Sequence, residues 1–285
     1  MILITDGGST KCDWVLLNRH RDVVFRTKTP GLNPAVLTSE ELKRRIIDNR
    51  DLRAISEQIE AVDFYGAGCG TSKPKKSVHQ VLSALFPNAA VKVYEDTAAA
   101  VFAVTTTPGI VCILGTGSNS CYFDGKNIHQ PIASLGYSVM DEASGSWFGR
   151  ALIRDYFYKR MPTSIAEAFA ANYNLDADDI KMNLYQKPHP NAYLATFAPF
   201  LFQEKEGVKK DAYFYDLIKK EMATFIDCRI LSFENATEVP IHFVGSIAQF
   251  SKDIIEECFR EHNLKLGTIL QHPIDGLIEY YKSRS

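Results

Sequence analysis

Two stretches of the sequence decide the fold: Ile2-Leu-Ile-Thr-Asp-Gly-Gly-Ser-Thr-Lys11 and Gly109-Ile-Val-Cys-Ile-Leu-Gly-Thr-Gly-Ser-Asn119. In each, an apolar run typical of a buried strand stops at glycine, and hydroxyl side chains and unhindered backbone N–H groups follow. Successive N–H groups in such turns form concavities that hold anions. Two of these turns, about one small domain apart, predict a phosphate chain gripped from both sides and so a protein that handles a nucleotide.

Length and composition bound the class of protein. The 285 residues suffice for one large or two ordinary domains, and 46% hydrophobic residues can form a substantial core. A net charge of −2 gives no basic surface for nucleic acid and no reason to expect a membrane partner. No apolar run approaches the ~20 residues that span a bilayer, and Asp6 comes too early for a secretion signal.

The cysteines indicate a reducing compartment. There are six, scattered along the chain without a CxxC pair or a nearby histidine cluster: Cys12, Cys69, Cys112, Cys121, Cys228 and Cys258. This pattern favours free thiols over a disulfide framework or a zinc site. We therefore expect a cytoplasmic protein.

Apolar periodicity predicts the elements of the first half. A helix should begin after Thr38, because Thr-Ser-Glu-Glu41 forms a capping box. Three strands precede this helix, at 2–6, 13–18 and 23–27. Strands and helices then alternate, at 61–65, 77–86, 91–95 and 97–104.

The same order starts again after the linker-like stretch Thr105-Thr-Thr-Pro-Gly109. Three strands are expected at 110–115, 120–123 and 127–131, followed by a long helical region from about 147 to 233. The remaining elements are a strand within 240–245, a helix at 246–261, a strand at 268–270 and a helix at 274–282. An aromatic stripe around Phe197, Phe200 and Phe214 is expected to be core or a dimer face.

The two halves share this element order without being sequence repeats. Sheets of this α/β kind bind ligands at the carboxyl ends of their parallel strands. Two such layers facing each other would bring both glycine turns to one crevice. The sequence therefore predicts an α/β protein of two domains with a cleft between them.

Five motifs resemble the sugar kinase/actin/heat-shock-chaperone ATPase superfamily, and within it the N-acetylglucosamine kinase-like branch that also holds the BadF/BadG/BcrA/BcrD ATPases. They occur in the family's order and cover nearly the whole chain, with 160–235 the least matched. The motifs are Asp6-Gly-Gly-Ser-Thr-Lys11, Tyr94-Glu-Asp-Thr-Ala-Ala99, Gly115-Thr-Gly-Ser-Asn119, Asp141-Glu-Ala-Ser-Gly145 and Val244-Gly-Ser-Ile-Ala248.

The resemblance implies two ribonuclease H-like, actin-like ATPase domains flanking an interdomain cleft. The N-terminal domain would comprise residues 1–108 and the C-terminal helix 271–285, and would hold one phosphate turn and the sugar side. The C-terminal domain would comprise residues 109–270, and would hold the other phosphate turn and the adenosine side.

The resemblance also implies that the two turns hold the β- and γ-phosphates of ATP. Asp6 would position Mg²⁺ through water, in keeping with that ion's preference for water, carboxylate and phosphate ligands. Taken alone, Asp6 is also typical of a turn after an edge strand, and Gly245-Ser246 of a simple β-to-α turn. The implied ATP-binding residues are Gly7, Gly8, Ser9, Thr10, Lys11, Gly115, Thr116, Gly117 and Ser118, with Gly245 and Ser246 at the adenosine.

Asp96 lies at a predicted strand-to-helix junction. Aspartate is a preferred helix N-cap, and by the resemblance Asp96 is also the general base that takes a proton from the attacking sugar hydroxyl. Such help is typically worth ~10²–10⁴ in rate. Glu95 is not expected to share this role, because neighbours along a strand point to opposite faces.

The implied sugar-binding residues, besides Asp96, are Asn33, Gly68, Asn119 and Asp141. Asn33-Pro34 is equally an ordinary turn initiator, and the stretch 66–72 around Gly68 is equally a glycine-rich connector, since it lacks the GxGxxG spacing.

The chain departs from the family pattern in two places. Ala143 stands where glycine is usual, and the loop before Asp141 is shorter than in the vertebrate-type enzyme. The resemblance therefore supports nucleotide binding more strongly than it supports selectivity for an N-acetyl group.

The leading hypothesis is an ATP-dependent kinase for an amino-sugar hydroxyl, most of all that of N-acetylglucosamine, with ATP and Mg²⁺ as cofactors and homodimerisation left open. One alternative is an ATPase that activates a redox partner. The activators of this superfamily hold an iron–sulfur cluster by cysteines in stretches that correspond to 94–100 and 141–145, and neither stretch contains cysteine here.

Two further alternatives are weaker. A catalytically inactive sugar- or nucleotide-binding regulator would not need the retained Asp6 and Asp96. The zinc-binding repressor/glucokinase branch is disfavoured because its CxCGxxGC signature is absent.

Overall fold

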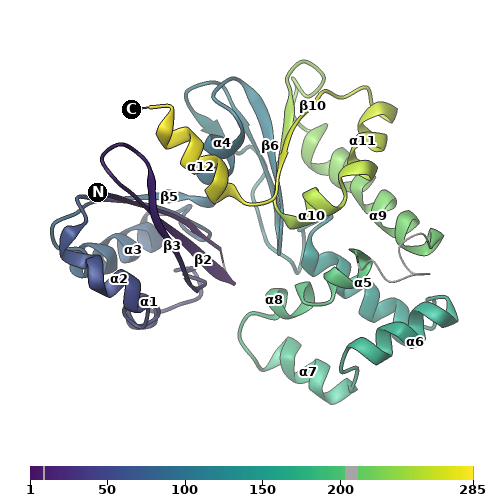
Figure 1. The fold of residues 1–285 in the computed structure, drawn as a ribbon. Helices are drawn as coiled ribbons and strands as arrows, with labels where there is room; N and C mark the ends of the chain where they lie inside the picture. Colours follow the sequence, from purple (N-terminus) through teal and green to yellow (C-terminus); the bar gives the residue numbers. More distant parts are fainter. Residues whose placement is uncertain (9, 203–210, 285) are drawn as a thin grey trace. The chain divides into compact units, whose positions relative to one another are not determined.

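The computed structural model describes residues 1–8, 10–202 and 211–284. The chain forms two compact units, each built on a five-stranded sheet (Figure 1). Unit 1 comprises Met1–Thr106 and His272–Ser285, and unit 2 comprises Thr107–Gln271. Both sheets are mixed and carry helices, which confirms the predicted α/β fold class.

The sheet of unit 1 has the strand order β3-β2-β1-β4-β5. β1 pairs antiparallel with β2 and parallel with β4, and β4 pairs parallel with β5. Because of this register, Gly7, Gly66 and Glu95 end their strands side by side at one edge of the sheet. The strands are β1 (Ile2–Gly7), β2 (Lys11–Leu17), β3 (Val23–Pro30), β4 (Ala61–Gly66) and β5 (Ala90–Glu95).

Five helices and a 3₁₀ turn accompany this sheet in the described part of unit 1. One half of the capping box forms, since the Thr38 hydroxyl accepts from the Glu41 amide at 3.2 Å, while the Glu41 carboxylate accepts from Arg44 and Arg45. Two helices differ from expectation: α2 was not predicted, and α3 begins at Ser72 rather than at 77. The elements are α1 (Ser39–Ile47), α2 (Arg50–Ile55), the turn Ser56–Gln58, α3 (Ser72–Leu85), α4 (Asp96–Val104) and α12 (Pro273–Lys282).

Helix α12 is the last element of the chain, yet it packs along α4 of the same unit (Figure 1). Gly276 permits this close approach, because a Cβ there would clash with the backbone carbonyl of Ala103. Phe102 and Tyr280 stack across the contact with ring centroids 4.8 Å apart. The C-terminal helix thereby completes the first unit.

The core of unit 1 forms around Trp14. Its ring packs against Phe64 and Phe86, with centroids 6.4 Å away in each case. The indole Nε1 donates to Thr29 Oγ1 at 3.0 Å, so the one polar atom of this buried side chain is satisfied. This packing fixes the meander of β1, β2 and β3 that carries the first glycine turn.

The sheet of unit 2 repeats the arrangement, with the order β10-β9-β6-β7-β8. Three antiparallel strands again form a meander, and two strands add in parallel on the other side of the first one. The shared element order predicted from the sequence is therefore confirmed. The strands are β6 (Gly109–Leu114), β7 (Ser118–Phe123), β8 (Ile128–His129), β9 (Ile241–Val244) and β10 (Leu266–Leu270).

The helical region predicted after the meander is confirmed for its described residues. Phe200 and Phe214 lie in the buried core, which is one of the two places expected for the aromatic stripe. The expected single helix at 246–261 is instead two helices that meet at Ser251. The elements are α5 (Gly145–Phe157), α6 (Thr163–Asn172), α7 (Ala177–Tyr185), α8 (Pro190–Ala195), a 3₁₀ segment (Ala198–Phe202), α9 (Ala212–Phe225), a π-helical turn (Ile226–Ile230), α10 (Ser246–Phe250) and α11 (Lys252–Glu261).

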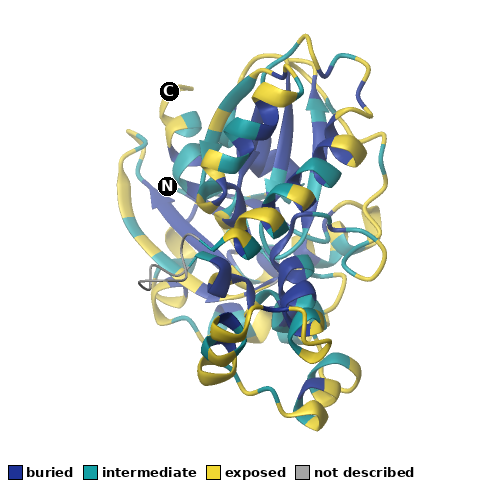
Figure 2. Ribbon diagram, turned by 90° about the vertical axis from the view of Figure 1, so that its right-hand side faces the viewer, coloured by how far each residue is buried: buried dark blue, intermediate teal, exposed yellow. Residues whose placement is uncertain are grey.

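Figure 2 shows the strands mainly in the colour of buried residues and the outer turns of the helices exposed. Among the described residues, no helix has both the length and the apolar character needed to cross a bilayer.

Candidate functional site

The glycine turn of unit 1 joins β1 to β2 and is held by the segment that follows β3. The Gly8 amide donates to the Lys11 carbonyl at 2.8 Å, which closes the turn. The amides of Gly31 and Leu32 donate to the carbonyls of Thr10 and Gly8 at 3.0 and 3.2 Å. Backbone hydrogen bonds therefore fix the turn, and Thr10 and Lys11 remain exposed. Ser9 lies outside the described residues.

Three carboxyl groups gather beside this turn. Burial raises the pKa of Asp6 to about 7, and the charges of Asp13 and Asp96 add to the effect. Asp13 itself is paired with the ammonium groups of Lys11 and Lys28 at 3.0 and 3.3 Å. An additional cation would therefore stabilise the charged forms of Asp6 and Asp96.

Asp96 is the first residue of α4, and the N-cap is Glu95. The expectation that Asp96 caps the helix is thus wrong by one position. Its Oδ1 accepts from the Thr97 amide at 3.0 Å. Burial and the neighbouring Glu95 raise the pKa of Asp96 to about 6, although the hydrogen bond opposes the shift. A carboxyl with this pKa is ionised at neutral pH and still accepts a proton readily.

Glu95 ends β5 and is the N-cap of α4, and its charge helps to raise the pKa of Asp96. Its carboxylate lies against the loop after β4, where a Cβ on Gly70 would be 2.7 Å from Glu95 Oε1. Burial, and to a lesser extent the charges of Asp96 and Glu95, raise the pKa of the Cys69 thiol. The thiol is therefore kept protonated and is a poor nucleophile.

The structure brings together two of the predicted sugar-side residues, Asn33 and Gly68. Gly68 has φ +77°, and a Cβ at this position would collide with Asn33 Oδ1. The same oxygen accepts from the Ala35 amide at 2.9 Å. Only glycine thus combines the left-handed conformation with this close approach to the Asn33 side chain.

The glycine turn of unit 2 lies between β6 and β7 and is held by the first turn of α5. The Gly115 amide donates to the Gly117 carbonyl at 3.0 Å. The amides of Gly145 and Ser146 donate to the carbonyls of Gly115 and Thr116 at 2.8 and 3.0 Å. Ser118, which was predicted in the turn, is the first residue of β7, and Asn119 is the second.

Asp141 lies directly beside this second turn. Its Oδ1 accepts from the Ser118 amide at 3.2 Å, and a Cβ on Gly117 would be 2.8 Å from its Oδ2. Burial raises the pKa of Asp141, while the Ser118 amide and the Arg229 guanidinium lower it. The structure therefore joins the Gly115–Asn119 and Asp141–Gly145 motifs into one cluster.

Gly245 closes the same cluster from the end of β9. It has φ +121°, and a Cβ there would clash with the Leu114 carbonyl, immediately before Gly115. Its amide donates to the Leu270 carbonyl at 2.9 Å. Ser246 is the first residue of α10 and is exposed. The three motifs of unit 2 that carry the family resemblance thus lie together.

Sequence reasoning missed two charged residues behind Asp141. Glu221 of α9 accepts from the Ala143 amide at 3.3 Å, and Arg229 Nε donates to Glu142 Oε2 at 3.2 Å. Burial and the nearby Glu142 raise the pKa of Glu221 to about 7. The sequence carries no local signal for either residue, because Lys219 and Lys220 precede Glu221, and Asp227 lies two positions before Arg229.

The structure also explains the departure at Ala143. This residue has φ +54°, in the left-handed region that glycine adopts at little cost. The hydrogen bond from its amide to Glu221 holds this conformation in place. Alanine therefore fills a position at which the family pattern has glycine.

The described residues contain no group of three or more histidine, cysteine or acidic side chains arranged to hold a metal ion. A metal site built from protein side chains alone is thus not present among them. An ion held by one carboxylate together with water and ligand oxygens would be compatible with this arrangement.

Comparison with solved structures shows the family to which the chain belongs. A Porphyromonas gingivalis protein described as a "putative N-acetylglucosamine kinase" is 35% identical, covers 99% of both chains and superposes with a TM-score of 0.91. The chain belongs to the N-acetylglucosamine kinase-like family. No protein-family model and no curated protein sequence matches it.

Two other structures share the fold of this N-acetylglucosamine kinase-like chain. A second protein described as a "putative N-acetylglucosamine kinase", from Chromobacterium violaceum, is 16% identical over 98% of both chains, with a TM-score of 0.69. A ROK family glucokinase from Streptomyces griseus, solved with glucose and AMPPNP, is 14% identical over 98% of this chain and 97% of its own, with a TM-score of 0.57. At these identities the likeness shows the fold alone.

Proposed function

We propose that this chain is an ATP-dependent kinase that phosphorylates a hydroxyl of an amino sugar, with N-acetylglucosamine as the first candidate. The observation that carries the proposal is Asp96, a carboxyl with a pKa of about 6 at the β5–α4 junction, in a member of the N-acetylglucosamine kinase-like family. A carboxylate of this basicity is suited to removing a proton from an attacking hydroxyl.

In the proposed reaction, the sugar hydroxyl oxygen attacks the γ-phosphorus of ATP. A new O–P bond forms, the bond between γ-phosphorus and the β,γ-bridging oxygen breaks, ADP leaves, and the hydroxyl proton passes to Asp96. Catalysis of this kind depends mainly on positioning and on neutralising charge. The two backbone turns would supply much of the positioning and much of the charge neutralisation.

The turns are proposed to bind the phosphates through backbone amides and hydroxyls. Their geometry supports this role because backbone hydrogen bonds fix both turns before any ligand arrives. In unit 1 the residues are Gly7, Gly8, Thr10 and Lys11, together with Ser9 outside the described part. In unit 2 they are Gly115, Thr116, Gly117 and Ser118, with Gly245 and Ser246 at the adenosine.

Asp6 fits a Mg²⁺ ion held largely through water. Its carboxyl is destabilised as an anion by burial and by Asp13 and Asp96, so an added cation at this position is favourable. When bound, Mg²⁺ would neutralise phosphate charge that develops during transfer. Lys11 and Lys28 are paired with Asp13, which leaves Asp6 as the carboxylate for the ion.

The sugar is proposed to contact Asn33, Gly68, Asn119 and Asp141 as well as Asp96. Asn33 packs on Gly68, and Asp141 is tied to Ser118. These contacts preorganise each side chain, so that less conformational entropy is lost when the sugar binds.

The alternative of a redox-partner activator has less support. Residues 94–100 and 141–145 contain no cysteine, and five of the six cysteines are buried as free thiols. The exposed thiol, Cys228, lies in neither stretch. An inactive regulator would not require the raised pKa of Asp96.

Release of ADP by the purified protein with Mg-ATP tests the proposal. The arms are N-acetylglucosamine, glucosamine, N-acetylmannosamine, N-acetylmuramic acid, glucose and no sugar, each with the wild type and with Asp96→Asn. Stimulation by one amino sugar that the substitution abolishes would support the kinase. Turnover indifferent to every sugar would reject it, and iron content would then test the activator.

A further inference from the structure

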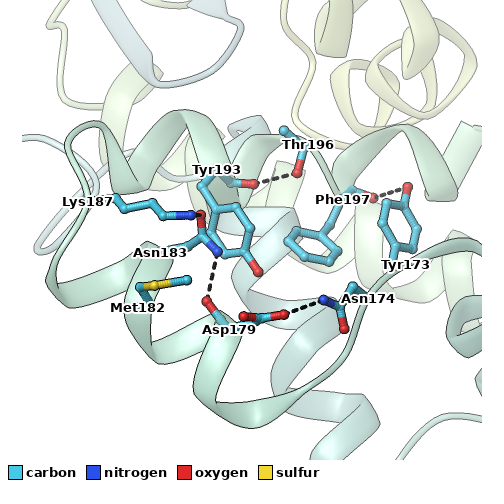
Figure 3. A pocket seen from close by; sticks show the side chains of 9 residues that line it. All are labelled: Tyr173, Asn174, Asp179, Met182, Asn183, Lys187, Tyr193, Thr196 and Phe197. Atoms are coloured by element: carbon cyan, nitrogen blue, oxygen red, sulfur yellow. Dashed lines mark hydrogen bonds between the residues drawn. The ribbon is translucent and has the colours of Figure 1, made fainter.

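A hollow of about 350 Å³ lies among α6, α7 and α8 of unit 2, and none of its lining residues belongs to the candidate site (Figure 3). Its size falls at the lower end of the range for small-molecule pockets, roughly 300–1,000 Å³. Aromatic rings and polar side chains share the lining. This composition calls for a small ligand with both apolar and hydrogen-bonding surfaces.

The aromatic part consists of Tyr173, Tyr193 and Phe197. The Tyr173 and Phe197 rings are 4.8 Å apart and inclined by 37°, and the Tyr193 and Phe197 rings are 5.3 Å apart and inclined by 89°. Neither pair forms the parallel walls between which a planar base would stack. Phe197 is itself buried, so the half-buried rings of Tyr173 and Tyr193 offer the single faces that suit the apolar face of a sugar ring.

The polar part of the lining is a hydrogen-bonded network around Asp179. Its Oδ2 accepts from Asn174 Nδ2 at 2.6 Å, and its backbone carbonyl accepts from Asn183 Nδ2 at 2.7 Å. The Lys187 ammonium donates to Asn183 Oδ1 at 3.4 Å. These bonds fix the side chains and leave unused donors and acceptors on them. Such a mixture matches sugar hydroxyls, which both donate and accept.

The Tyr193 hydroxyl completes this arrangement. It forms no hydrogen bond with any described residue, and Figure 3 shows it directed toward Asp179 and Asn174. Burial and the Asp179 charge raise its pKa. The hydroxyl is therefore a neutral donor, and a ligand oxygen in the hollow would accept from it.

We propose that the α6–α8 hollow, where tilted aromatic faces meet the Asp179–Asn174–Asn183 network, is a second binding site for an uncharged monosaccharide. Helix α8 separates this site from α5. Its Leu194 carbonyl lies against Gly149 and its Ala195 Cβ lies against Gly145, whereas Tyr193 lines the hollow. The proposal is independent of catalysis.

Methionine methyl NMR tests the proposal, because the chain has five methionines and two of them report separately. Met182 lines the hollow, and Met140 precedes Asp141. The protein labelled with ¹³C at the methionine methyls is titrated with glucose, N-acetylglucosamine and, as a planar control that carries no sugar, adenine. The Met182 signal should shift saturably with a sugar and not with adenine. Any shift of Met140 reports on the site proposed for catalysis instead.

A matched pair of variants makes the test specific. Tyr193→Phe removes only the hydroxyl and should weaken the sugar affinity seen at Met182 about fivefold, the value expected for one hydrogen bond. Tyr185→Phe, at an exposed position of the neighbouring α7, should leave it unchanged. The proposal is overturned if Met182 does not move at ~50 mM sugar, which would saturate a millimolar site. An equal response to adenine, or no effect of Tyr193→Phe, would overturn it as well.

Discussion

The backbone amide of Ser118 donates to Asp141 Oδ1 at 3.2 Å, although the two residues are 23 positions apart. This bond connects the strand after the second glycine turn to the segment that begins α5. The amides of Gly145 and Ser146 return to the same turn, so the two motifs hold each other. A change that breaks one of these hydrogen bonds should therefore affect the other motif.

The first prediction concerns Asp141. Asp141→Asn keeps an oxygen for the Ser118 amide but removes the charge offered to a sugar hydroxyl. A hydrogen bond to a charged group contributes roughly 1.5–3 kcal/mol, so KM for the sugar should rise roughly 10- to 100-fold. KM for ATP should change little. Steady-state kinetics with each substrate varied in turn measures both, and an unchanged sugar KM would remove Asp141 from the proposed sugar site.

The second prediction separates binding from folding at the second turn. A Cβ on Gly115 would meet nothing within 4 Å, so Gly115→Ala should leave the melting temperature unchanged while occupying space proposed for phosphate. Nucleotide affinity, measured by calorimetry with Mg-AMPPNP, should fall at least tenfold. Undiminished affinity would argue against phosphate binding by this turn.

Gly245→Ala is the matched control for this experiment. Its Cβ would clash with the Leu114 carbonyl, and the residue is at φ +121°. The variant should therefore lower the melting temperature markedly, because strain and overpacking each cost ~1–3 kcal/mol. A fully stable Gly245→Ala would contradict the tight packing of β9 on the end of β6.

The third prediction is a pH dependence of catalysis. Asp96 must be ionised to take a proton, and its pKa is raised to about 6. The value of kcat/KM should therefore fall as pH drops through about 6. A profile flat from pH 5 to pH 8 would require a different group as the base.

The fourth prediction concerns Glu221 and stability. Its pKa is raised from 4.5 to about 7, so the folded state binds the proton more tightly than the unfolded chain does. This contribution to the free energy of unfolding is complete below about 4.5 and is lost as pH rises through about 7. The swing is on the order of 3 kcal/mol.

Glu221→Gln should abolish this loss of stability at higher pH. Urea unfolding of both proteins at about pH 5 and about pH 8 measures the difference. Relative to the wild type, the variant should gain stability at the higher pH. If both proteins lose the same stability between the two pH values, Glu221 does not carry a raised pKa.

The sequence predicts the sheets well because their signals are local. Apolar runs give the strands, and a capping box places the start of α1 at Thr38. The repeated strand order also follows from element order, since short turns impose the meander in each unit. The break at Ser251 and the early start of α3 have no comparable local signal, because tertiary packing selects those helix ends.

The site could be predicted only in part, for a related physical reason. The glycine turns and Asp141 are visible as motifs, but Glu221 and Arg229 act on that segment from about 80 positions away. Only the fold supplies their hydrogen-bond partners, the Ala143 amide and the Glu142 carboxylate. The influence of Glu95 on the pKa of Asp96 was likewise not predicted, because strand alternation stops where β5 gives way to α4.

The measurement that tests the central claim most directly is product identity after incubation with Mg-ATP and N-acetylglucosamine. Mass spectrometry and ³¹P NMR should detect a sugar phosphate formed in equal amount with ADP by the wild type. Asp96→Asn should form it about 10²–10⁴ times more slowly, with its fold intact by circular dichroism. ADP without any phosphorylated amino sugar, or an Asp96→Asn variant as fast as the wild type, would contradict the account.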